Sequence, residues 1–202
     1  MMRFIALWLC GICVAMFVVQ LLVGTNAVIL DRSLAWQEPW RFVTAIFAHS
    51  NTGHLLSNLF ALGLFGLVLE GRIGYRRVLW LFLISGLLIN VFSPYPRSLG
   101  ASGAIFAILG ALVVLRPFMM VWVSGIPMPM IIAGIVWLAQ DIFGVFMPTN
   151  VGNIAHIAGL FFGIGTGLFW RKEFADRPTP KSPRDNVLEK ELDMWEDKYM
   201  KK

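Results

Sequence analysis

The sequence predicts an all-α membrane protein, and three observations lead to that class. Apolar residues make up 57% of the 202-residue chain. Charged residues make up 14%, whereas soluble domains carry about a quarter. Apolar stretches close to the roughly 20 residues that a spanning helix needs recur along the chain. We therefore expect a bundle of transmembrane helices.

The charged residues gather at the C-terminal end. Residues 1–170 hold eight arginines, four acidic residues and no lysine, whereas residues 171–202 hold nine basic and eight acidic residues. We therefore divide the chain into a transmembrane domain, 1–170, and a charged cytoplasmic tail, 171–202, with a Pro-rich linker and an amphipathic helix. The net charge of +5 then reflects membrane orientation, and no nucleic-acid partner is expected.

The first predicted span covers residues 4–23. A signal peptide is the alternative, but its apolar core is only about 7–15 residues long, so we expect a retained helix. The connection that follows, residues 25–50, carries Trp36 and Trp40 together with charges of both signs. This composition is typical of the lipid–water interface.

Five further spans are predicted. They cover residues 53–69, 78–94, 102–115, 128–146 and 151–170. The fourth span of the chain, 102–115, is short, so it begins inside the bilayer, and the loop before it must be buried in protein or face a water-filled cavity. The predicted fold is a six-transmembrane-helix bundle with a long interfacial first loop and a short fourth helix.

The distribution of basic residues predicts the orientation. Six spans put both termini on one side of the membrane. The ends and loops on that side hold Arg3, Arg72, Arg76, Arg77, Arg116, Arg171 and Lys172, and the opposite side holds Arg32, Arg41 and Arg97. By the positive-inside rule both termini lie in the cytoplasm, and Ser102 lies near the outer side.

Ser102 stands between glycines in the stretch GASGAIFAILGA, residues 100–111. Small residues let membrane helices pack closely, which is one interpretation of the stretch. The other is that the serine is a nucleophile. Three histidines, His49, His54 and His156, fall in or beside predicted spans, where ionisable side chains are costly and functional by default. Their presence favours the second interpretation.

The small residues around His156 predict contact between the fourth and sixth spans. They repeat every fourth residue, as Ala155, Gly159, Gly163 and Gly167 in one span and as Gly103, Ala107 and Ala111 in the other. Two such faces permit close packing. That contact would bring Ser102 beside His156, which is the smallest nucleophile–base unit.

His54 and Asn58 are four residues apart, so they share one face of the second span. Together they offer an imidazole and an amide, which can donate hydrogen bonds to a developing oxyanion. The alternative is an interhelical polar contact worth about 1 kcal/mol or less.

Other membrane chemistries fit the residues less well. A zinc metalloprotease would need the motif HExxH, which is absent. An aspartyl protease would need two membrane aspartates, and only Asp141 is available. A three-histidine metal or haem site is a distant third, so no metal and no cofactor are expected.

The chain resembles the rhomboid family of intramembrane serine proteases over residues 1–170. The motifs that carry the resemblance are GASG around Ser102, AHIAGLFFG around His156, HLLSN from His54 to Asn58, Trp40-Arg41 and EGRIG at residues 70–74. One departure is Phe106, at a position where the family often has a tyrosine that stacks on the histidine. Phenylalanine keeps the aromatic face.

The resemblance implies that Ser102 is the nucleophile, His156 the general base, and His54 and Asn58 the oxyanion donors. No acid is expected to orient His156, so the site is read as a dyad. The implied partners are single-span transmembrane protein substrates and membrane lipid, in the plasma membrane, and no oligomeric state is indicated. The alternative is a catalytically inactive rhomboid-like protein that binds transmembrane helices.

Overall fold

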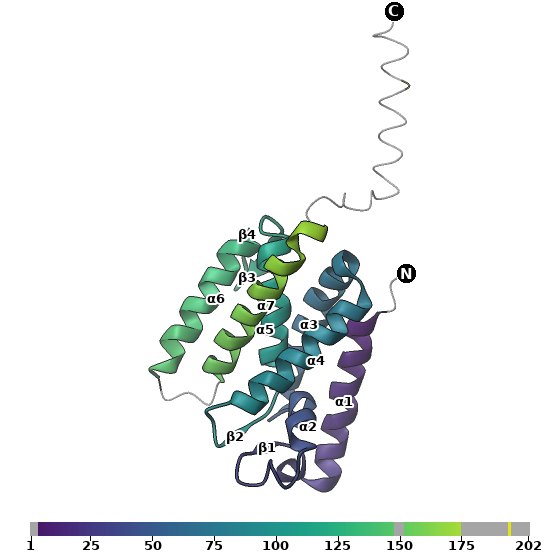
Figure 1. The fold of residues 1–202 in the computed structure, drawn as a ribbon, viewed down its shortest axis with the longest axis vertical. Helices are drawn as coiled ribbons and strands as arrows, with labels where there is room; N and C mark the ends of the chain where they lie inside the picture. Colours follow the sequence, from purple (N-terminus) through teal and green to yellow (C-terminus); the bar gives the residue numbers. More distant parts are fainter. Residues whose placement is uncertain (1–3, 148–151, 175–193, 195–202) are drawn as a thin grey trace, which may run out of the picture.

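The structure is a computed structural model, which describes residues 4–147, 152–174 and 194. The part of the chain that it describes is mostly helical (Figure 1). Its helices are α1 (Ile5–Val23), α2 (Arg41–Phe47), α3 (Thr52–Ile73), α4 (Tyr75–Phe92), α5 (Ser102–Leu115), α6 (Met130–Val145) and α7 (Asn153–Phe174). The helix predicted within the tail lies outside the described residues.

Four of these helices, α1, α3, α4 and α7, are long and apolar enough to cross a membrane. The apolar helices α5 and α6 are shorter, with 14 and 16 residues. The short helix predicted over 102–115 has the bounds of α5. Helix α7 continues to Phe174, four residues past the predicted domain boundary, and the Phe174 side chain is fully buried there.

Short strands occur in the connections, where only loops and helices were expected. Strand β1 (Leu30–Asp31) pairs with β2 (Arg97–Ser98), and β3 (Met120–Val123) pairs with β4 (Ile126–Pro129). The prediction that a helix begins at residue 128 is therefore wrong by two residues. Met128 pairs with Val121, and Pro129 is in an extended conformation, so α6 begins at Met130.

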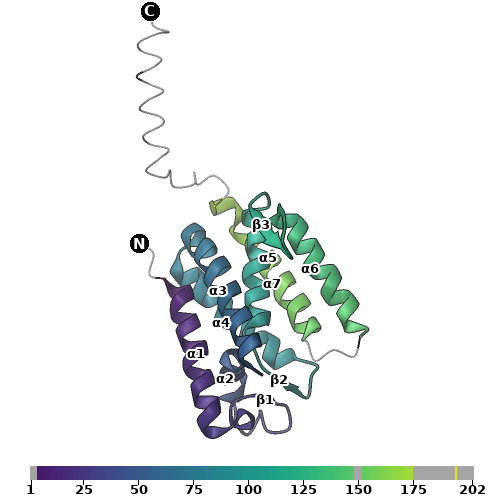
Figure 2. The same ribbon diagram turned by 180° about the vertical axis from the view of Figure 1, so that it is seen from behind.

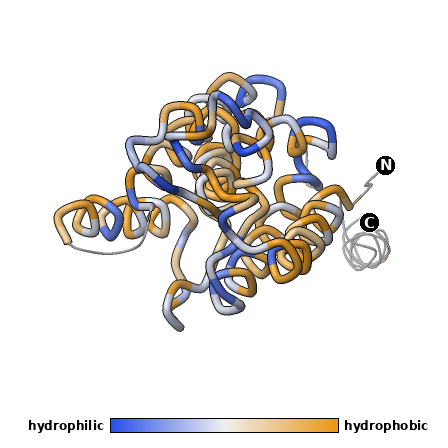
Figure 3. Tube along the Cα trace, turned by 90° about the horizontal axis from the view of Figure 1, so that it is seen from below, coloured by the Kyte–Doolittle hydropathy of each residue, from blue (hydrophilic) through white to orange (hydrophobic). Residues whose placement is uncertain are grey.

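Large apolar side chains cover the outside of the bundle. Trp8 and Leu22 on α1 are 70% and 80% exposed, and Phe169 on α7 is 83% exposed. Hydrophobic residues accordingly dominate the helical part of the trace (Figure 3). Apolar patches of this extent are not found on soluble monomers, whereas lipid requires them.

Helices α5 and α7 pack directly against each other, as predicted from their small residues. A Cβ at Gly163 would lie 2.7 Å from the carbonyl carbon of Ala107, and one at Gly159 would lie 3.0 Å from that of Gly103. Neither backbone can yield without moving a helix. Figures 1 and 2 show the two helices side by side from both directions.

The beginning of α1 and the end of α7 lie at the same end of the bundle (Figure 2). There the Ala6 amide donates to Glu70 of α3, at 3.3 Å, and Arg77 of α4 donates to Glu173 of α7, at 3.0 Å. Helix α2 and the β1–β2 pair cover the opposite end, where α5 begins. The arrangement therefore puts Ser102 at the end remote from both termini.

Candidate active site

Gly100 shapes the chain just before Ser102. Its φ is +119°, a conformation that side chains disfavour, and its amide donates to the carbonyl of Ala45 in α2 at 2.8 Å. A Cβ at this position would lie 2.8 Å from Cε1 of His54. Glycine therefore allows the imidazole of His54 to lie against the backbone beside Ser102.

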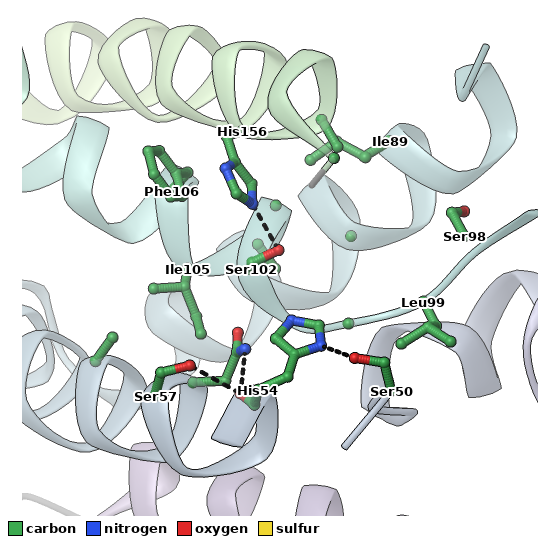
Figure 4. A pocket seen from close by; sticks show the side chains of 18 of the residues that line it. Ser50, His54, Ser57, Ile89, Ser98, Leu99, Ser102, Ile105, Phe106 and His156 are labelled. Carbon is green, nitrogen blue, oxygen red and sulfur yellow. Dashed lines mark hydrogen bonds between the residues drawn. The ribbon is translucent and has the colours of Figure 1, made fainter. Parts of the chain in front are cut away.

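Ser102 and His156 are brought together by the contact between α5 and α7. The Oγ of Ser102, the first residue of α5, lies 2.8 Å from Nε2 of His156 in the first turn of α7. Figure 4 shows the two side chains pointing toward each other across the pocket. The distance is that of a hydrogen bond between a nucleophile and its base.

Phe106 lies one helical turn after Ser102 and stacks on the His156 ring. The ring centroids are 4.3 Å apart and the planes are inclined by 3°. The expectation that phenylalanine keeps the aromatic face at this position is confirmed. Because the stack covers one face of the imidazole, its two nitrogens make their contacts in the ring plane.

An acid does lie beside His156, so the expectation that none is placed to orient it is wrong. The Oδ1 of Asp141, in α6, lies 2.9 Å from Nδ1 of His156. Asp141 entered the sequence reasoning only as a single membrane aspartate, too few for an aspartyl protease. Asp141 is the only acid in the predicted fifth span, and an ionisable residue in a span indicates a function. The spacing of 15 residues between Asp141 and His156 does not predict that the two are in contact.

A chain of hydrogen bonds at the start of α3 holds the His54 side chain. Asn51 caps this helix, because its Oδ1 accepts from the His54 amide at 2.9 Å, and its Nδ2 donates to Ser50 Oγ at 3.3 Å. The Ser50 hydroxyl can then donate to Nδ1 of His54, 3.2 Å away. When it does, the ring proton lies on Nε2, the nitrogen that lies close to Gly100.

Asn58 lies one turn further along α3 and lines the same pocket. Its Nδ2 donates to the His54 carbonyl at 2.7 Å, and the residue is 5% exposed. One of its two N–H groups is therefore used within the helix. This bond stiffens the first turns of α3, and the other N–H is the one available to a ligand.

His49 lies outside this group and ties α1 to the start of α3. Its amide donates to Gln20 at 2.8 Å, and its Nδ1 donates to the Phe47 carbonyl at 3.0 Å. Burial and, to a smaller extent, the neighbouring His54 lower the pKa of His49 to about 4, while the Phe47 hydrogen bond opposes the change. The residue is 1% exposed, and these contacts fit a structural role.

The site opens into a cavity of about 930 Å³. Its lining includes the polar residues Ser50, His54, Arg97 and Ser102 and the apolar residues Phe65, Leu109 and Trp137. Arg97 is oriented by an ion pair of 3.0 Å with Asp31. Hydrogen bonds from Ser33 lower the pKa of Asp31, and Arg97 adds to the effect while desolvation opposes it.

The first amides of α5 point toward the same region. The first hydrogen bond of the helix runs from the Ile105 amide to the Ala101 carbonyl, at 2.9 Å. The amides of residues 102–104 therefore have no partner within the helix, and the helix dipole makes this end attractive to negative charge. Among the described residues no group of three or more His, Cys, Asp or Glu side chains is arranged to hold a metal ion.

The fold and the site together define a multi-helix membrane protein with a serine–histidine pair inside its bundle. A family model described as Rhomboid domain matches residues 36–173. This is more than half of the chain, and the chain belongs to the rhomboid family.

Curated relatives carry the same family name. RHOMBOID-like protein 1 of Arabidopsis thaliana is 31% identical over 135 residues, which cover 65% of this chain and 34% of the relative. Rhomboid protease GlpG of Yersinia pestis is 28% identical over 182 residues, which cover 79% of this chain and 59% of the relative. RHOMBOID-like protein 6, mitochondrial, of Arabidopsis thaliana is 31% identical over 65% of the chain and 43% of its own length. The chain thus spans between about a third and three fifths of these relatives.

Proposed function

We propose that this protein is an intramembrane serine protease that hydrolyses peptide bonds in or near transmembrane segments. The observation that carries the proposal is the hydrogen bond of 2.8 Å between Ser102 Oγ and His156 Nε2. Both residues line a cavity within an apolar helical bundle. A relative named as a rhomboid protease supports it.

The reaction proceeds by acyl transfer. Nε2 of His156 takes the hydroxyl proton as Ser102 Oγ bonds to the substrate carbonyl carbon. The resulting oxyanion accepts hydrogen bonds from the first-turn amides of α5, from Nε2–H of His54 and from the second amide N–H of Asn58. His156 returns the proton to the leaving amine, and water then releases the acyl group by the same two proton transfers.

In the membrane the chain forms six spans, with α5 and α6 as the two short ones. Both termini lie in the cytoplasm, and the active site opens toward the outer side of the plasma membrane. The beginning of α1 and the end of α7 lie at the same end of the bundle, which supports placing both termini on one side of the membrane. The excess of basic residues at that end supports the cytoplasmic side. Residues 1–170 form the protease domain, and the charged tail extends from it on the cytoplasmic side.

The substrates are single-span membrane proteins, which enter the site from the surrounding lipid. A stable helix already uses its backbone N–H and C=O groups internally. The scissile segment must therefore unwind before an active site can bind it. We expect glycine or proline near the outer end of a substrate span to favour cleavage, because these residues weaken the helix by about 1 and 3 kcal/mol.

The test is cleavage of a reconstituted single-span substrate in liposomes, with the products identified by mass spectrometry. Wild-type protein is expected to cut near the outer end of the span, and Ser102→Ala to leave the substrate intact. A glycine pair introduced near that end should raise the rate over a matched alanine pair. Wild-type protein that binds the substrate without cutting it would instead favour the inactive, helix-binding alternative.

A further inference from the structure

Asp141 and His156 are joined by a partly buried hydrogen bond that has no role in the reaction proposed above. The carboxylate oxygen and Nδ1 are 2.9 Å apart, and the side chains are 9% and 12% exposed. A hydrogen bond to a charged group is stronger than a neutral one, and more so where water is excluded. With Ser102 on the other ring nitrogen, the imidazole bridges an acid and a hydroxyl.

The packing of α6 on α7 holds this pair together. Gly144 follows Asp141 by three residues, so the two share one face of α6. A Cβ at Gly144 would lie 2.7 Å from Oδ1 of Asn153, and Asn153 precedes His156 by three residues on α7. The absence of a side chain at Gly144 thus allows the two helices to approach, and the approach brings the carboxylate within reach of the ring.

We infer that Asp141 is a positioning residue for His156, an inference that rests on the proposed protease function. A carboxylate can only accept, so Nδ1 donates to it, and the lone pair of Nε2 is directed at Ser102. When Nε2 takes the serine proton, the imidazolium forms beside a negative charge that stabilises it. Asp141 accepts this hydrogen bond throughout and transfers no proton.

Few charged groups surround His156 in the described part of the site. Helix α5 brings Ser102 and no charged residue, and α4 carries its arginines, Arg76 and Arg77, at the opposite end of the bundle. His54 on α3 and Arg97 before α5 line the same cavity. Neither is an acid, so among these residues Asp141 is the one whose side chain can accept the Nδ1 proton of His156.

The experiment compares wild type with Asp141→Asn and Asp141→Glu on the reconstituted substrate, with Gln140→Ala as the control for an exposed neighbour on α6. Asp141→Asn is expected to lower kcat on the order of 100- to 10,000-fold with little change in KM. Asp141→Glu keeps the carboxylate and should recover part of the rate.

A purely structural role would reduce the amount of folded protein without lowering the kcat of the folded fraction. Asp141→Asn with wild-type kcat would overturn the inference, while an inert Ser102→Ala in the same assay keeps the protease proposal standing. Inactive wild-type protein overturns both. If Asp141→Asn does not fold, nitrogen NMR of wild-type protein, assigned by the loss of signals in His156→Ala, decides the matter. A proton on Nδ1 is expected, and a proton on Nε2 contradicts the inference.

Discussion

The His156 imidazole is held by three side chains from two other helices. Asp141 accepts from Nδ1 at 2.9 Å, and Ser102 lies on Nε2 at 2.8 Å. Phe106 covers one ring face at a centroid distance of 4.3 Å. Because each contact constrains a different degree of freedom, the ring is oriented before any substrate binds, which is what a general base requires.

Replacing the aromatic ring at position 106 tests the stacking contact. Phe106→Leu is expected to lower kcat about 2- to 10-fold, since an aromatic pair is worth about 0.5–1.5 kcal/mol. Phe106→Tyr keeps the ring and should retain the wild-type rate. Steady-state cleavage of the reconstituted substrate measures both, and equal rates for leucine and tyrosine would show that the stack does not contribute.

His49 makes the stability depend on pH. Its pKa is about 4 in the folded protein and about 6.5 when exposed in the unfolded chain. Between these values the unfolded state binds more protons, so stability rises with pH there. The contribution is complete above about pH 6.5 and is lost as the pH falls toward 4.

Equilibrium unfolding in detergent at pH 7.5 and pH 5 measures this dependence. The free energy of unfolding should be a few kcal/mol lower at the acidic pH. His49→Gln removes the titrating group and should flatten the slope while lowering the stability at pH 7.5. An unchanged slope in that variant would assign the acid sensitivity to other residues.

At the scale of helices, the α5–α7 contact determines whether the site exists. The two helices approach through glycines whose added side chains would meet backbone, as at Gly163 and at Gly110, where a Cβ would lie 2.9 Å from the Ile164 amide nitrogen. Small residues are the usual means of such approach in membranes. Since Ser102 begins α5 and His156 lies on α7, a separation of the helices also separates these two side chains.

Two glycines of α7 form a matched pair for testing this contact. Gly163→Ala brings a methyl group against Ala107, whereas Gly165→Ala meets no atom within 4 Å. We expect Gly163→Ala to destabilise the protein by about 1–3 kcal/mol and to reduce cleavage. Gly165→Ala should leave the thermal midpoint unchanged or slightly raised. Equal midpoints for the two variants would show that the helices are not in close contact.

Much of the helical arrangement could be predicted from the sequence, because hydropathy and small-residue spacing are local signals. They gave the bounds of α5 and its contact with α7. The β1–β2 pair joins residues 30–31 to 97–98, and no local sequence pattern predicts a pairing between segments so far apart in the chain. The Asp141–His156 contact was missed for a related reason, since it depends on how α6 packs, which spacing along one helix does not reveal.

At the scale of the whole molecule, an apolar exterior surrounds a cavity that is lined by both polar and apolar side chains. Side chains such as Trp8 and Phe169 face outward, while His54, Ser102 and Arg97 line the cavity of about 930 Å³. Polar groups at membrane depth persist only where protein or water satisfies them. A cavity that admits water is also what hydrolysis within a bilayer needs, so the fold and the proposed chemistry require the same feature.

The most direct measurement of the central claim is covalent labelling of the detergent-purified protein by a fluorophosphonate, which reacts with activated serines. Wild-type protein should be labelled at one site, identified by mass spectrometry as Ser102. Ser102→Ala and His156→Ala should remain unlabelled, whereas Gly165→Ala should label like wild type. Folded wild-type protein without label, or label that persists in Ser102→Ala, would contradict the assignment of Ser102 as a nucleophile activated by His156.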